Sequence, residues 1–153
     1  GLTALQGNER YSIILNWNVV PGAEAYRVYR KDAHGVSRLL GEVLQPGFTD
    51  QNGVMKGGFI IPSTHYVYQV TAVAGTVESA AVEVVGHDER GLKGDNNRSD
   101  LVDGRDLERL AQKFAFADTD QGFDPLVDTT YDGRIDGSDL IDYAANFALS
   151  YQP

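Results

Sequence analysis

Oxygen-bearing side chains are concentrated in two segments of the chain, residues 95–106 and 128–139. In each segment, positions 1, 3, 5, 9 and 12 all carry a side-chain oxygen. An EF-hand-like loop presents these positions, together with the carbonyl oxygen of position 7, to a calcium ion. The spacing therefore predicts two bound Ca²⁺ ions. The predicted ligands are Asp95, Asn97, Ser99, the Leu101 carbonyl, Asp103 and Asp106 in the first loop, and Asp128, Thr130, Asp132, the Arg134 carbonyl, Asp136 and Asp139 in the second.

The two loops belong to an internal repeat, because a shift of 33 residues places Asp95 on Asp128 and keeps one register through the following segment. In that segment apolar residues recur at i, i+3, i+4 and i+7, which is typical of an amphipathic helix. The stripes are Leu107, Leu110, Ala111 and Phe114 in the first unit, and Leu140, Tyr143, Ala144 and Phe147 in the second. We expect both stripes to form the shared core of two stacked units.

The loops differ at position 6, where a sharp turn requires a positive φ and therefore favours glycine. Gly133 meets this requirement, whereas the first loop has Asp100, a residue type that tolerates the left-handed region better than most. Position 8 is apolar in both loops, and we expect Val102 and Ile135 to pair the loops through a short backbone contact. The second loop offers four carboxylates and the first offers three, so the second should bind calcium more tightly.

Charge is distributed unevenly, with a net charge of −1 over residues 1–87 and −8 over residues 88–153. Acidic clusters repel nucleic acid and anionic membranes and attract cations, which excludes nucleic-acid binding. No apolar run approaches the ~20 residues of a membrane span, so no membrane insertion is expected. Without cysteine, small domains must be held by their cores or by a metal.

The connector between the two units, residues 115–127, contains the carboxylates of Asp118, Asp120 and Asp124. A third cation site is one interpretation of this segment, but we expect a solvated acidic loop instead.

The first part of the chain has the period-two alternation of β-strands, in residues 12–17, 25–30, 66–72 and 77–85. Glycine- and proline-containing turns separate these runs, which indicates an antiparallel sandwich. A polar, glycine-containing segment follows and predicts a short linker. We therefore divide the chain into residues 1–86, a β-sandwich; residues 87–94, a linker; and residues 95–153, the double calcium module.

Several residues of the first part resemble those of a fibronectin type III domain. They are Trp17 after the first alternating run, Tyr26-x-Val28, Phe48-Thr49-Asp50 and Tyr66-x-Tyr68-x-Val70-x-Ala72. The resemblance implies that Tyr66 is the corner tyrosine near the start of the penultimate strand. The segment 51–64 is longer than this family usually has, and its role is open.

The second part resembles dockerins, the calcium-binding modules that attach carbohydrate-active enzymes to cohesin domains. Each unit is a loop followed by a helix, position 12 is aspartate rather than glutamate, and the unit occurs twice behind a small sandwich. The resemblance implies an extracellular location and a cohesin partner. It places partner recognition at loop positions 10 and 11 and at mid-helix. These positions are Gly104, Arg105, Ala111, Gln112, Gly137, Ser138, Ala144 and Ala145. They depart from the usual Ser-Thr-like pairs, so the cohesin class is open.

The resulting fold class is multidomain: an all-β fibronectin type III-like sandwich followed by a small α module of two calcium loop–helix repeats. The histidines, His34, His65 and His87, have no nucleophile or ligand partner at a useful spacing, which argues against catalysis. We expect the chain to be a monomeric, non-catalytic docking module and a fragment of a longer protein. A catalytic domain, if the parent protein has one, would lie outside this fragment. Two alternatives stay open: a calcium-stiffened spacer or anchor without a cohesin, and carbohydrate binding by the sandwich through Tyr29 or Phe59.

Overall fold

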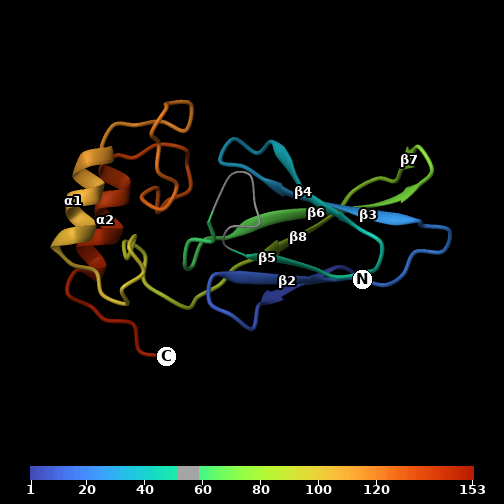
Figure 1. Ribbon diagram of the computed structural model, residues 1–153, viewed down its shortest axis with the longest axis horizontal. Helices are drawn as coiled ribbons and strands as arrows, with labels where there is room; N and C mark the ends of the chain where they lie inside the picture. The colour runs from blue at the N-terminus through green and yellow to red at the C-terminus, as the bar shows by residue number, and fades with distance from the viewer. Residues whose placement is uncertain (52–58) are drawn as a thin grey trace.

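The computed structural model describes residues 1–51 and 59–153 and shows a β-sandwich next to a smaller helical part (Figure 1). The helices stand at the end of the molecule remote from the sandwich, and the loops that precede them lie between the two parts (Figure 1). Most of the long segment noted above, residues 52–58, lies outside the described residues. No helix in the described ranges is long and apolar enough to cross a membrane.

The sandwich consists of two antiparallel sheets. One has the order β1 (Thr3–Gln6), β2 (Ser12–Asn16), β5 (Phe48–Gln51). The other has the order β4 (Ser37–Val43), β3 (Ala25–Lys31), β6 (Tyr66–Ala74), and both β7 (Val77–Glu78) and β8 (Val82–Gly86) pair with β6. The run predicted over residues 77–85 is therefore two strands, and β1, β4 and β5 add strands that the alternation had not indicated.

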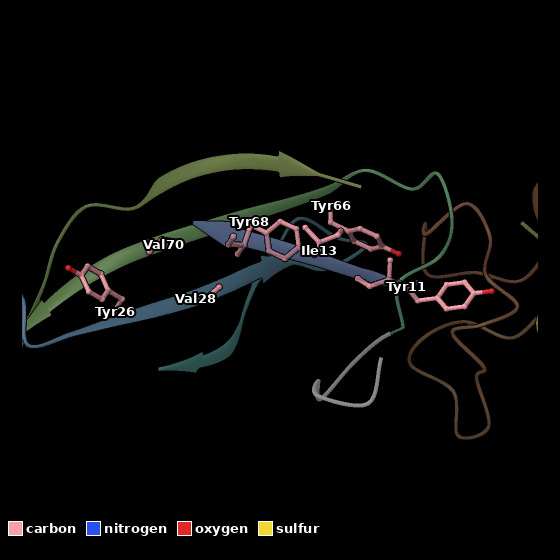
Figure 2. Packing of buried hydrophobic residues seen from close by; sticks show 9 residues of the cluster. Tyr11, Ile13, Tyr26, Val28, Tyr66, Tyr68 and Val70 are labelled. Carbon is pink, nitrogen blue, oxygen red and sulfur yellow. The ribbon is translucent and has the colours of Figure 1, made fainter. Parts of the chain in front are cut away.

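Alternating side chains of the strands fill the space between the sheets, as the period-two pattern predicts (Figure 2). Ile13, Leu15 and Val28 are fully buried there, and Tyr66 and Tyr68 lie beside them. The Tyr66 hydroxyl accepts a hydrogen bond from the backbone N–H of Ile61 at 2.8 Å and donates to the carbonyl of Phe59 at 3.4 Å. This is the geometry of a tyrosine corner, so the predicted role of Tyr66 is confirmed.

An ion pair is buried inside the sandwich. The Arg30 guanidinium lies 2.7 Å from Asp50 Oδ2, and both side chains are at most 2% exposed. The hydroxyl of Tyr68 donates to the same carboxylate oxygen at 2.7 Å. Charge compensation and hydrogen bonding together make this burial tolerable.

The helical part contains α1 (Gly104–Lys113) and α2 (Gly137–Asn146), which lie side by side (Figure 1). Each begins with a capping box, in which the N-cap side chain accepts from the backbone and the N3 carboxylate reaches back to the N-cap N–H. The pairs are Asp103 with Asp106 and Asp136 with Asp139. The core of this part is Val102, Leu110, Val127, Ile135 and Tyr143.

The prediction that both apolar stripes lie in the core holds for three of their eight residues. Leu110 and Tyr143 are buried and Leu107 is partly buried. Ala111 and Ala144 are exposed, and Leu140, Phe114 and Phe147 are 43%, 48% and 48% exposed. The helices end one residue before each phenylalanine, whose ψ of 138° (Phe114) or 133° (Phe147) takes the chain out of the helix. The i+7 residue of each stripe is therefore turned away from the core.

The expected contact between the two position-8 residues is also different. The backbone N–H of Val102 donates to Leu149 at 3.2 Å and its carbonyl accepts from Ala148 at 2.8 Å. The backbone of Ile135 bonds in the same way to Ala115 and Phe116. Each loop is therefore tied to the chain that follows the other unit's helix, which interlocks the two units.

The predicted linker, residues 87–94, packs on the sandwich. Asp88 is fully buried, accepts from the backbone N–H of Ser12 at 3.1 Å and pairs with Arg90 at 2.9 Å. Arg90 also donates to the carbonyls of Asn8 and Glu9. The carbonyl of Lys93 accepts from the side-chain amide of Asn146 at 3.1 Å, so the segment contacts both parts of the chain.

Candidate metal centre

The first aspartate of each predicted loop holds the loop closed around its carboxylate. Asp95 accepts from the backbone N–H of Ser99 at 2.9 Å and of Asp100 at 2.8 Å. In the second loop, Asp128 accepts from the N–H of Asp132 at 3.2 Å and of Gly133 at 2.9 Å. The two loops therefore curl in the same way about position 1.

Two residues in each loop have left-handed backbone angles. Position 6 has the expected positive φ, 68° at Asp100 and 82° at Gly133. Position 4 has it as well, with φ of 59° at Arg98 and 56° at Tyr131. The sequence did not indicate position 4, because arginine and tyrosine are not residues that favour this region. These backbones carry strain that the surrounding loop must hold.

The last aspartate of each loop joins its two ends. Asp106 and Asp139 are fully buried. Asp106 Oδ1 accepts from the N–H of Asn96 at 3.0 Å, while Oδ2 accepts from Asp103 at 2.9 Å. Asp139 bonds likewise to Thr130 at 3.1 Å and to Asp136 at 2.9 Å. One side chain thus serves the start of the loop and the start of the helix.

Other predicted ligands point toward one another within their loops. The Ser99 hydroxyl donates to the Leu101 carbonyl at 3.2 Å, and the Thr130 hydroxyl lies 3.3 Å from Asp128 Oδ1 and 3.2 Å from Asp139 Oδ1. In the described ranges, however, no three His, Cys, Asp or Glu side chains form a group able to hold a metal by themselves. A cation would therefore also need the amide, hydroxyl and carbonyl oxygens.

The electrostatics of the loops favour a bound cation. Burial raises the pKa of Asp128 to about 6, and the neighbouring carboxylates of Asp139 and Asp132 act in the same direction. Burial also raises the pKa of Asp95. A hard cation would stabilise the ionised forms, and an all-oxygen donor set suits Ca²⁺ better than a transition metal. The residues present therefore fit calcium in donor type and order.

The three carboxylates of the connector are committed to separate partners. Asp118 lies 2.8 Å from His34 Nε2, and Asp120 accepts from the N–H of Ala117 at 2.8 Å. Asp124 pairs with Arg109 at 2.6 Å.

The predicted partner positions lie at the surface of the helical part. Gly104, Arg105, Ala111, Gln112, Gly137, Ala144 and Ala145 are exposed, and Ser138 is half-buried. Large apolar side chains are exposed on and just after the same helices. They are Phe114, Leu140, Ile141, Phe147 and Leu149, with Ile141 at 69% exposure. We call Phe114, Leu140, Ile141 and Phe147 the apolar helix face; sequence reasoning had placed most of it in the core.

The residues considered for other functions have different roles. His65 stacks with His87 at 4.6 Å, and His34 contacts Asp118. Tyr29 donates its hydroxyl to Glu78 on the outer face of the sandwich at 2.7 Å. The Arg98 guanidinium lies over the ring of Phe59, with its central carbon 5.0 Å from the ring centroid. Tyr29 is thus held by its hydroxyl, and Phe59 has an arginine over its ring.

No protein-family model and no curated protein matches the chain. Among solved structures, the chain is similar to an Fn3-like protein from Clostridium thermocellum, with 30% identity over 57% of this chain and 88% of that one and a TM-score of 0.45. It is also similar to FN3tt, with 17% identity over 58% and 90% and a TM-score of 0.46. The fn3 domain of human collagen alpha-1(XX) matches at 17% identity over 57% and 79%, with a TM-score of 0.43.

The classification rests on two observations. The strand orders β1-β2-β5 and β4-β3-β6 with β8, together with the tyrosine corner at Tyr66, are those of a fibronectin type III sandwich. The N-terminal part of the chain therefore has a fibronectin type III-like fold.

Proposed function

We propose that the chain is a non-catalytic, calcium-dependent protein-docking module. The observation that carries this proposal is the double use of Asp106 and Asp139, each of which closes a calcium-type loop and caps the helix that follows. A cation held by the loops would thus fix where α1 and α2 begin. It would thereby order the helices that carry the exposed side chains of the apolar helix face.

The proposed partner is a cohesin domain in the extracellular space, as the resemblance to dockerins suggests. A fibronectin type III-like domain is common in proteins that bind other proteins or carbohydrates, which is compatible with this role. The apolar helix face would supply the buried centre of the interface. Arg105 and Gln112 in one unit, and Ser138 and Ala145 in the other, would supply polar and small contacts at its rim.

The test is capture of a panel of cohesin domains by the full chain, with Ca²⁺ and with a chelator. We expect retention of at least one cohesin in Ca²⁺ only. Ile141→Asp should abolish retention because it places a charge on the apolar helix face, whereas Val36→Asp, an exposed apolar position on the sandwich, should not. Failure of the folded, calcium-loaded chain to retain any cohesin at micromolar concentration would contradict the proposal.

A second candidate function is a calcium-stiffened spacer without a cohesin partner. It is favoured by the contacts between the sandwich and the helical part, such as the 2.8 Å contact between His34 and Asp118 of the connector. In that case the distance between the chain ends would respond to calcium while no cohesin is captured. A pair of fluorescent labels at the two ends would measure that response.

A further inference from the structure

The side chains at position 4 of both loops reach across to the sandwich. In the first loop, the Arg98 guanidinium carbon lies 4.2 Å from the ring centroid of Tyr11 and 5.0 Å from that of Phe59. In the second loop, the Tyr131 hydroxyl donates to the carbonyl of Lys31 at 3.2 Å. Equivalent positions of two repeated units therefore contact the same neighbouring domain.

The direction of these side chains depends on the fold of the loops. Position 4 stands between the predicted ligands at positions 3 and 5, and its backbone is left-handed in both loops. A non-glycine residue keeps this conformation only where its surroundings hold it. Arg98 and Tyr131 can therefore make their contacts with the sandwich only when the loops are closed.

The sandwich contacts the two loops through side chains that have partners within the sandwich or pair with a loop residue. Arg30, held by Asp50 in the core, lies 4.7 Å from the ring centroid of Tyr66 and 6.0 Å from that of Tyr131. Arg10 pairs with Asp100, the position-6 residue of the first loop. Both loops thus rest on side chains that are fixed by the fold of the sandwich.

We propose that the calcium loops dock on the sandwich through Arg98 and Tyr131, so that calcium binding and the joining of the two domains form one coupled equilibrium. This inference rests on the proposed calcium sites and adds a regulated contact to them. Coupling is reciprocal. Calcium stabilises the sandwich, which holds none of the predicted ligands, and the sandwich raises the affinity of the loops for calcium.

The chain carries its own reporter for this coupling. Trp17 is the single tryptophan and belongs to the sandwich, with its ring 5.4 Å from that of Tyr26. Figure 2 shows Tyr26 at the end of the core opposite to Tyr11 and the loops. Selectively excited tryptophan fluorescence therefore follows the sandwich alone, while circular dichroism of the helices follows α1 and α2.

The experiment compares thermal unfolding of the full chain, by both signals, in Ca²⁺ and in a chelator. We expect Ca²⁺ to raise the Trp17 midpoint by at least about 4 °C, the shift that a stabilisation of ~1 kcal/mol gives a domain of this size. In the double variant Arg98→Ala/Tyr131→Ala this shift should disappear, while the helical signal still responds to calcium. Its calcium affinity should fall by about fivefold or more, the lower end of typical coupling.

The control Arg27→Ala/Tyr29→Ala removes the same two side-chain types from the outer face of the sandwich, where both contact Glu78, and should keep the shift.

Arg10→Ala distinguishes coupling from simple electrostatics without altering a loop residue. Loss of a positive charge beside an acidic loop would by itself tighten calcium binding, whereas loss of coupling weakens it, and we expect the latter. A Trp17 midpoint that is unchanged by Ca²⁺, in a chain shown by calorimetry to bind the ion, would overturn the coupling and leave cohesin capture unaffected. Absence of calcium binding would overturn both this inference and the proposed function.

Discussion

The phenol ring of Tyr131 stands edge-on to the ring of Tyr66, with the ring centroids 4.9 Å apart and the planes inclined by 70°. Tyr131 belongs to the second predicted calcium loop, and Tyr66 is the buried corner tyrosine of the sandwich. This aromatic contact therefore connects the loop to the core of the neighbouring domain.

This contact predicts a graded response to substitution at Tyr131. Tyr131→Phe keeps the ring contact and loses the hydrogen bonds of the hydroxyl, those with the Lys31 carbonyl and with Arg30, at a cost of about 0.5–1.5 kcal/mol for each bond in Ca²⁺. Tyr131→Ala also loses an aromatic pair worth about 0.5–1.5 kcal/mol beyond its buried area. Urea unfolding followed by Trp17 fluorescence measures both, and equal losses for the two variants would contradict the role of the ring.

The buried ion pair of the sandwich predicts strong non-additivity. Arg30→Met leaves the fully buried Asp50 without its counter-charge and should lower the free energy of unfolding by about 3–5 kcal/mol. The double variant Arg30→Met/Asp50→Leu removes both charges and should lose clearly less. Chemical unfolding of Arg30→Met, Asp50→Leu and the double variant tests this. A double variant whose loss of stability equals the sum of the two single losses would be evidence against it.

The two loops should differ in affinity. The second has four carboxylates and the glycine Gly133 at the left-handed position 6, whereas the first has three and a strained Asp100 there. Asp128→Ala should therefore remove the tighter site and Asp95→Ala the weaker one. Calorimetric titration of each variant would show which site is lost, and the reverse order would contradict the ranking.

We predict that Glu78, on the outer face of the sandwich, makes a contribution to stability that is lost in acid. Hydrogen bonds from Thr71, Tyr29 and Arg27 lower the pKa of Glu78 to about 2. Its value in the unfolded chain is about 4.3, so the folded state binds fewer protons between these values. The stability from Glu78 is present above pH ~4.3 and is lost as the pH falls toward 2. The difference in unfolding midpoint between the wild type and Glu78→Gln should shrink over this interval, and a constant difference would argue against it.

The sandwich was largely predictable because its central strands are buried on one face and therefore alternate. In β2 and β6 every second residue faces the core, as at Ile13 and Leu15 or Tyr66 and Tyr68. Strands β1 and β4 escaped prediction because they are mostly exposed and carry no such alternation. An exposed strand is recognised by its pairing with a neighbour, which periodicity does not report.

The two helices were predictable from the repeat, whereas their bounds were not: they begin at Gly104 and Gly137, inside the predicted loops. The stripe ending at Phe114 suggested a buried side chain, but the backbone leaves the helix there, and Phe147 repeats this. The contacts of the position-4 residues, Arg98 and Tyr131, could not be predicted either. Their left-handed backbone conformation is determined by tertiary packing, because neither residue type prefers it.

Calorimetric titration of the chelator-treated chain with Ca²⁺ tests the central claim most directly. The account predicts binding of two ions per chain, with the tighter site lost in Asp128→Ala. It also predicts weak replacement by Mg²⁺, which requires a smaller octahedral site and keeps its waters. Absence of binding heat, together with a helical signal and unfolding midpoint that do not change on adding Ca²⁺, would contradict it.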